Sequence, residues 1–129
     1  MEAIVTPNFP LEKSAYSPAV RVGDTLYISG QVPLDSATGN VIGDDITSQT
    51  RKTFSNLEAL LGHCGLSLAD VAKVTIYLSD IEKIGEMNQE YARILGDHKP
   101  ARACVEVSRI ALDMMIEVEA VAIFPEGNA

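Results

Sequence analysis

Residues 115–124 read MIEVEAVAIF, and both alternating rows of side chains in this run contain apolar residues. In a β-strand, successive side chains point to opposite faces of the sheet. One row holds Ile116, Val118, Ala120 and Ala122, and the other holds Met115, Glu117, Glu119, Val121 and Ile123. A chain of 129 residues has no second layer to cover the second row. Because soluble monomers rarely expose large apolar patches, we expect other subunits to cover that face, which places Glu117 and Glu119 near a subunit boundary.

Two amphipathic helices are predicted from apolar residues that recur at helical spacing. The first covers residues 46–64, with Asp45 before it and Gly65 after it. Acidic residues favour the positive N-terminal end of a helix, and glycine can adopt the left-handed conformation that ends one. The second helix covers residues 84–95 and stops near Gly96.

Four further strands are predicted from alternation of apolar and polar residues or from a preceding chain breaker. They cover residues 19–22, 25–29, 73–78 and 103–108. Gly23-Asp24 between the first two is typical of a tight hairpin. Residues 35–43 indicate a turn or short irregular hairpin, residues 67–70 indicate a capping box that opens one helical turn, and the pattern leaves an extra N-terminal strand open. The order β-β-α-β-α-β-β predicts an α+β fold with two helices on one face of the sheet.

The whole chain, residues 1–129, is predicted to form one domain, since domains of about 100–150 residues are the commonest. It is 47% hydrophobic and 22% charged, a balance typical of a globular protein. Its two cysteines, Cys64 and Cys104, match neither a disulfide framework nor a zinc-binding spacing. The first ten residues lack the features of a secretory signal, and no apolar run approaches the ~20 residues that span a bilayer. We therefore expect a cytoplasmic protein that does not associate with membranes.

The charge balance argues against a nucleic-acid partner. The chain carries 10 basic and 18 acidic residues, for a formal net charge of −8. Proteins that bind nucleic acids normally gather Lys and Arg into a basic patch that neutralises phosphates. The basic residues of this chain form no run, although one local pocket could still attract a small anion.

Residues 100–119 contain the side chains best suited to chemistry. Pro100 fixes the backbone just before a strand and so holds Arg102 at the entrance of that strand. Arg102 could bind a carboxylate through two parallel hydrogen bonds, or it could be an ordinary surface or interface arginine. Glu117 lies among apolar neighbours, where a half-buried carboxylate needs a partner. The two histidines, His63 and His98, have no plausible ligand set around them, so we expect no metal site.

The same segment is similar to the signature of the Rid family, also written YjgF or RidA, the reactive-intermediate imine deaminases. The matching residues are Pro-Ala-Arg-Ala-Cys-Val from Pro100 onward and Ile-Glu-Val-Glu from Ile116 onward. Agreement extends to residues 27–33 (YISGQVP), residues 65–78 (GLSLADVAKVTIYL) and residues 88–91 (NQEY). The resemblance covers nearly the whole chain, in order.

This resemblance implies a chorismate-mutase-like α+β fold that assembles as a homotrimer with clefts between subunits. It implies an enzyme that hydrolyses 2-imino acids, such as 2-iminobutanoate and 2-iminopropanoate, to 2-oxo acids and ammonia. By similarity, Arg102 would bind the substrate carboxylate, the backbone carbonyl of Cys104 would face the imine nitrogen, and Glu117 would position or activate water. Three further residues would line the cleft, expected from the neighbouring subunit: Tyr16, Ser29 and Gly30.

The substrate is already reactive, so neither a metal nor an organic cofactor is required. Cys104 is interpreted as a small apolar residue rather than a nucleophile, because no base is evident beside it. The chain departs from the family at residues 14–19, where SAYSPA replaces the usual Gly-Pro-Tyr-Ser-Gln-Ala, and at residues 96–99, where the loop is shorter than usual. The shorter loop predicts an altered pocket size or access.

Two other functions are compatible with the resemblance. One is a non-catalytic trimeric protein that binds 2-oxo acids or similar metabolites in the same cleft, for which Arg102 would serve equally well. The other is a ribonuclease or translation inhibitor, as ascribed to some relatives. The net charge of −8 and the absence of a basic run disfavour the second.

Overall fold

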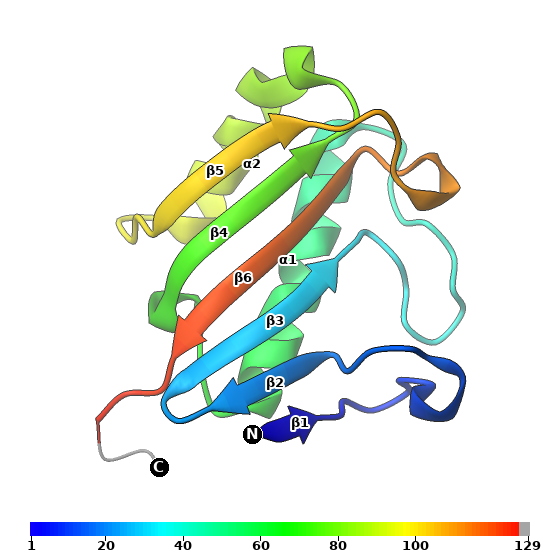
Figure 1. Ribbon diagram of the computed structural model, residues 1–129. Helices are drawn as coiled ribbons and strands as arrows, with labels where there is room; N and C mark the ends of the chain where they lie inside the picture. The colour runs from blue at the N-terminus through cyan, green and yellow to red at the C-terminus, as the bar shows by residue number, and fades with distance from the viewer. Residues whose placement is uncertain (127–129) are drawn as a thin grey trace.

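The computed structural model describes residues 1–126, which form one mixed six-stranded sheet with two helices (Figure 1). The strands are β1 (Glu2–Ile4), β2 (Ala19–Val22), β3 (Thr25–Gln31), β4 (Val71–Leu78), β5 (Ala101–Glu106) and β6 (Ile116–Ile123). Their order across the sheet is β1-β2-β3-β6-β4-β5. Only β4 and β5 pair in parallel; the other neighbours are antiparallel. The predicted α+β class is confirmed, as are its two helices and the extra N-terminal strand.

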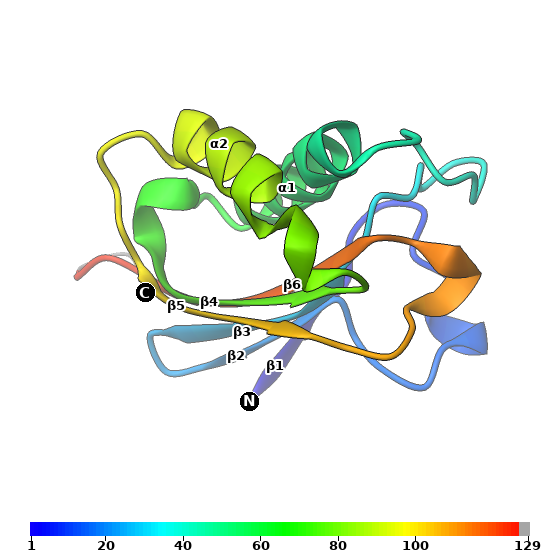
Figure 2. The ribbon, with the colours of Figure 1, turned by 90° about the horizontal axis from the view of Figure 1, so that it is seen from above.

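The helices α1 (Ile46–His63) and α2 (Ile84–Leu95) both lie on one face of the sheet (Figure 2). Short 3₁₀ turns occur at η1 (Leu11–Lys13), η2 (Leu68–Asp70), η3 (Ile81–Lys83) and η4 (Ala111–Asp113). Asp45 caps α1 by accepting a hydrogen bond from the Ser48 backbone amide at 2.8 Å. Gly65 follows α1 at a φ of +76°, which suits glycine. The helix limits predicted from the sequence are therefore correct to within one residue.

Three strands differ by two residues from their predicted limits: β3 extends to Gln31, β4 begins at Val71, and β5 is shifted as a whole. β5 runs over Ala101–Glu106 instead of residues 103–108, because its parallel pairing with β4 begins immediately after Pro100. It ends at Glu106, beyond which the Val107 amide donates to the Leu78 carbonyl at 2.8 Å.

Residues 35–43 form a turn closed by a single bridge between Leu34 and Val41, in keeping with the predicted irregular hairpin.

The core lies between the helices and one face of the sheet. It is built mainly from aliphatic side chains, with two buried aromatic residues, Phe54 at the centre of α1 and Phe124 just after β6. In β6, Ile116, Val118, Ala120 and Ala122 are all buried in it. The row predicted to point inward is therefore confirmed.

The second face of the sheet has no helix over it in residues 1–126 (Figure 2). Large apolar side chains are solvent-accessible there: Tyr27 is 52% exposed, Val105 is 45% exposed and Ile123 is 42% exposed. Glu117 and Glu119 lie among them, on the same row of β6 as Ile123. We refer to this surface, which carries Tyr27, Val105, Glu117, Glu119 and Ile123, as the open face.

Candidate functional site

Arg102 lies on the edge strand β5 and points toward the face that the helices cover. Its register partner on β4 is the buried Val74, and paired residues of neighbouring strands share a face. Its Nη1 donates a hydrogen bond to Asn88 Oδ1 of α2 at 2.7 Å, and its guanidinium carbon lies 4.8 Å from the centre of the Tyr91 ring. Within residues 1–126, no carboxylate forms an ion pair with Arg102. Its charge is therefore available to an anionic ligand.

Cys104 lies two residues further along β5, on the same face as Arg102. Its register partner on β4 is the buried Ile76, and its side chain is half-buried. Burial raises the pKa of the Cys104 thiol, while the nearby Arg102 charge acts in the opposite direction. A thiol with a raised pKa is a weak nucleophile at neutral pH. The environment thus favours a role for the backbone of Cys104 over one for its sulfur, and that role stays a prediction.

Glu117 lies on β6, and its side chain is on the open face. Its carboxylate packs directly on Gly30 of β3, so that a Cβ at position 30 would overlap Oε2 and would lie 2.9 Å from Cδ. Position 30 therefore accepts no larger residue while Glu117 keeps this conformation. Burial raises the pKa of the Glu117 carboxyl, and the negative charge of Glu119 raises it further. A carboxyl that holds its proton more readily than usual is suited to proton transfer near neutral pH.

A second polar pair lies beside Glu117 on the open face. The Tyr77 hydroxyl of β4 donates a hydrogen bond to the Glu119 carboxylate, which raises the pKa of that hydroxyl. Tyr77 is the register partner of Glu117. The sequence predicts Glu119 near a subunit boundary but indicates no role for Tyr77, because a tyrosine in an alternating strand has no distinctive pattern.

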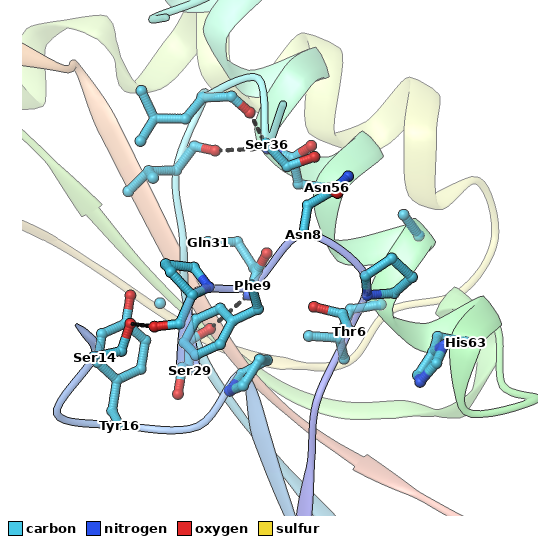
Figure 3. A pocket seen from close by; sticks show the side chains of 18 residues that line it. Thr6, Asn8, Phe9, Ser14, Tyr16, Ser29, Gln31, Ser36, Asn56 and His63 are labelled. Carbon is cyan, nitrogen blue, oxygen red and sulfur yellow. Dashed lines mark hydrogen bonds between the residues drawn. The ribbon is translucent and has the colours of Figure 1, made fainter. Parts of the chain in front are cut away.

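Tyr16, Ser29 and Gly30 line one pocket of about 560 Å³, as Figure 3 shows in part. A β-bulge between Ile28 and Gln31 interrupts the pairing of β3 with β6 where Ser29 and Gly30 lie. The Ser29 hydroxyl donates to the Ser17 carbonyl at 2.7 Å. The structure thus brings these three predicted residues together, with Glu117 against the third.

The N-terminal segment forms one wall of this pocket, a feature that the sequence analysis missed. Residues 6–10 line it, and the ring of Phe9 meets the ring of Tyr16 edge to face, with their centres 5.4 Å apart. In Figure 3, Phe9 lies between Tyr16 at one end of the pocket and His63 of α1 at the other. Asn8 has a φ of +67°, which asparagine tolerates in turns. The Pro-Asn-Phe-Pro sequence was the available signal, since it is typical of a turn and not of a strand.

Glu117 lies on the opposite face of the sheet from Arg102 and Cys104. Tyr77 of β4 pairs both with Glu117 of β6 and with Val105 of β5, so these three side chains share the open face. Cys104 and Arg102 alternate with Val105 and therefore lie on the helix-covered face. We call Arg102 with Cys104 the anchor half-site. We call Glu117 with the pocket of Tyr16, Ser29 and Gly30 the water half-site.

The surroundings of both histidines indicate a structural role. His98 Nε2 lies 2.7 Å from the Val71 carbonyl oxygen, and His63 lines the pocket at the end of α1. Among residues 1–126, no three His, Cys, Asp or Glu side chains are grouped as metal ligands would be. Across the same residues, no helix combines the length and the hydropathy that crossing a bilayer demands.

Comparison with known proteins identifies the family. The sequence profile described as endoribonuclease L-PSP matches residues 6–124. The chain belongs to this family, which is also called YjgF/Rid. The Rid resemblance predicted from residues 100–119 is therefore confirmed.

Relatives in the YjgF/Rid family resemble the chain over almost its full length. A RutC family protein of Pyrococcus horikoshii is 46% identical over 121 residues, which cover 94% of this chain and 96% of the relative. The 2-iminobutanoate/2-iminopropanoate deaminase of Salmonella typhimurium is 34% identical over 125 residues, covering 95% and 97%. The crystal structure of Escherichia coli TdcF with bound serine has a TM-score of 0.87 and 30% identity, covering 97% of this chain and 100% of that one.

Proposed function

We propose that this member of the YjgF/Rid family is a deaminase that hydrolyses 2-imino acids, such as 2-iminobutanoate and 2-iminopropanoate, to 2-oxo acids and ammonia. The observation that carries the proposal is the 34% identity to the Salmonella deaminase over 95% of this chain. The two half-sites supply the groups that such a reaction needs, namely a cation for the carboxylate and a carboxyl for proton transfer. TdcF, seen with serine, supports a ligand that has a carboxylate next to a nitrogen-bearing carbon.

The active enzyme is a homotrimer in this proposal. Arg102 and Glu117 of one chain lie on opposite faces of the sheet, so a complete site would combine Arg102 of one copy with Glu117 of another. The exposed apolar side chains of the open face provide a reason for copies to associate, because their burial removes apolar surface from water. Each cleft would then hold Arg102 and Cys104 of one subunit opposite Glu117 and Gly30 of its neighbour.

Arg102 would hold the substrate carboxylate through two parallel hydrogen bonds, which fixes both position and orientation. The imine N–H would donate a hydrogen bond to the backbone carbonyl oxygen of Cys104. Because β5 is an edge strand, alternate backbone groups along it have no partner strand among residues 1–126. This arrangement would present the electrophilic imine carbon to the water half-site.

Glu117 would transfer protons during hydrolysis. As the water oxygen bonds to the imine carbon, Glu117 accepts a proton from that water and the nitrogen becomes an amine by gaining a proton. The carbon–nitrogen bond of the resulting carbinolamine then breaks, the nitrogen leaves as ammonia with a further proton, and the hydroxyl oxygen becomes the carbonyl of the 2-oxo acid. One water is consumed and no electrons are exchanged, so these residues suffice without a cofactor.

A metabolite-binding protein without catalysis is the second candidate, favoured by the bound serine of TdcF. Such a protein needs the anchor half-site but makes no use of a proton-transfer group. Glu117→Gln separates the candidates, because it should leave ligand binding nearly intact in either case and should abolish turnover only in an enzyme.

A coupled assay tests the proposal directly. Threonine dehydratase generates 2-iminobutanoate, and the rate of its conversion to 2-oxobutanoate is measured with and without the protein. We expect wild type to accelerate the conversion, Arg102→Ala to be inactive with fold intact, and Arg102→Lys to lose most activity because lysine cannot bind a carboxylate in the bidentate manner. Unchanged rates with wild type, or near-normal rates with Arg102→Ala, would contradict the proposal.

A further inference from the structure

Arg102 is held by two groups of α2 that carry no charge. The amide oxygen of Asn88 accepts a hydrogen bond from Nη1 at 2.7 Å, and the Tyr91 ring lies under the guanidinium with its centre 4.8 Å from the central carbon. Tyr91 is itself fixed by Phe54 of α1, whose ring it meets edge to face at 5.5 Å. Burial raises the pKa of the Tyr91 hydroxyl, so that the residue stays neutral. We call Asn88 and Tyr91 the seat of Arg102.

The neutrality of the seat contrasts with how other arginines of this chain are held. Arg51 and Arg93 both bind Glu90, and Arg109 binds Asp113 at 3.0 Å. The chain has 18 acidic residues, so acidic partners for arginine are abundant. An aspartate at position 88 would have the same shape as asparagine and would bind Arg102 more strongly. It would also cancel the charge that a ligand carboxylate needs, because a guanidinium already paired with a carboxylate gains little from a second one.

We infer that Asn88 is a positioning residue that fixes the Arg102 guanidinium for carboxylate binding, and that its side chain must be an uncharged hydrogen-bond acceptor for this purpose. Tyr91 completes the seat by restricting the guanidinium to the plane above its ring. The inference rests on the proposed function, since the ligand is the carboxylate of a 2-imino or 2-oxo acid. With Nη1 bound to Asn88, the remaining N–H groups of the fork stay free to meet two carboxylate oxygens.

The positioning can be measured without any ligand, by nitrogen-15 NMR of the Arg102 guanidinium in the intact protein. A fixed guanidinium rotates slowly and gives separate Nη signals, whereas a free one gives a single averaged signal. We expect separate signals in wild type and in Asn88→Asp, and averaged ones in Asn88→Ala. Signals of Asn88→Ala that match those of wild type would overturn the positioning role.

The requirement for neutrality is measured by titrating 2-oxobutanoate into wild type and three variants. Asn88→Asp should weaken binding roughly tenfold or more, although its hydrogen bond to Arg102 is kept. Asn88→Ala should weaken binding less and should raise KM more than it lowers kcat. Gln89→Glu is the matched control, since it adds the same charge at the exposed neighbouring position and should change binding by less than about twofold through solvent screening.

Equal affinities of Asn88→Asp and Gln89→Glu for 2-oxobutanoate would overturn the inference, because a purely structural Asn88 would tolerate the isosteric change. The proposed function can fail separately. If wild type binds 2-oxobutanoate in this pattern but hydrolyses no imine, the seat is supported and the deaminase is not. If wild type binds no 2-oxobutanoate, the carboxylate anchor itself is refuted, and with it the role assigned to Asn88.

Discussion

The Glu117 carboxyl is enclosed by Gly30 on one side and lies next to the negatively charged Glu119. Both the loss of water and the like charge disfavour ionisation, so the pKa of Glu117 lies above the usual 4.5 of a glutamate. The Cys104 thiol also has a raised pKa, but the same shift disfavours its reactive form, which is the thiolate. The two residues are therefore expected to differ sharply in their importance to catalysis.

Substitution of each residue tests this difference. Cys104→Ser keeps the backbone carbonyl and should retain substantial turnover, with a modest loss of stability from a hydroxyl in a half-buried apolar site. Glu117→Gln keeps the shape but not the proton transfer, and should lower kcat by roughly 10²–10⁴-fold. Both are measured in the coupled assay. An inactive Cys104→Ser together with an active Glu117→Gln would indicate covalent catalysis instead.

The pH dependence of the reaction follows from the direction of the Glu117 shift. If ionised Glu117 takes a proton from water, kcat/KM falls as the pH drops through its pKa. Because that pKa is raised, the acid limb of the profile should lie at a higher pH than an ordinary glutamate gives. Glu119→Gln removes one cause of the shift and should move the limb to lower pH. A limb at the same pH in wild type and Glu119→Gln would rule out this assignment.

At the scale of the elements, Glu90 joins the two helices. It is 5% exposed on α2 and binds Arg51 of α1 at 3.0 Å as well as Arg93 of its own helix. These partners lower its pKa to about 2. A carboxylate whose pKa is lower in the folded state stabilises the fold above its unfolded pKa of about 4.5, and this contribution is lost as the pH falls toward 2.

Glu90→Gln should therefore lower the free energy of unfolding at pH 7 by about 1–3 kcal/mol, because the charge-assisted hydrogen bonds from two arginines to a buried carboxylate are lost. The difference from wild type should shrink as the pH is lowered from 5 to 3. Glu86→Gln provides the comparison, since Glu86 and Lys83 form an exposed pair at 3.9 Å that should contribute about 0–1 kcal/mol. Urea unfolding measures both, and equal effects of the two substitutions would contradict the assigned role of Glu90.

Elements with strong local signals were predictable from the sequence. The 3.6-residue spacing of α1, the Asp45 cap and the Gly23 turn are all local, and the structure confirms each. The predicted limits of β5 were wrong by two residues, because its parallel pairing with β4 joins residues far apart in the sequence. The sequence Ala-Arg-Ala-Cys-Val-Glu of β5 also lacks a clear alternation, so it could not reveal that Arg102 and Glu117 lie on opposite faces.

Arg102 and Glu117 could be singled out by their chemistry and neighbours, whereas the pocket residues were predictable only from the family motif. Tyr16, Ser29 and Gly30 were expected to lie together, and they line one pocket. Residues 6–10 form the wall of that pocket through an irregular backbone, which has no periodic pattern to recognise. Asn88 and Tyr91 belong to the NQEY stretch that resembles the Rid family, but their contacts with Arg102 depend on how α2 packs against β5.

At the scale of the whole molecule, the proposed trimer depends on the apolar side chains of the open face. We expect light scattering at micromolar concentration to give three times the chain mass of 13.9 kDa. Tyr27→Glu places a charge at an exposed apolar position of the open face and should shift the protein toward monomer with its circular dichroism unchanged. Ser55→Glu adds a charge to the exposed side of α1 and should leave the trimer intact. A wild-type mass near that of one chain would refute the trimer.

The opposite placement of Arg102 and Glu117 has a genetic consequence. In the proposed trimer, an Arg102→Ala allele should damage only one side of each cleft, and a Glu117→Gln allele only the other. When the two inactive proteins are mixed, unfolded and refolded together, each hybrid trimer should contain one cleft built from undamaged halves, so activity should reappear. No recovery in the mixture would mean that one subunit supplies both groups. A cell that carries both alleles should therefore clear imines although neither gene copy encodes a working enzyme.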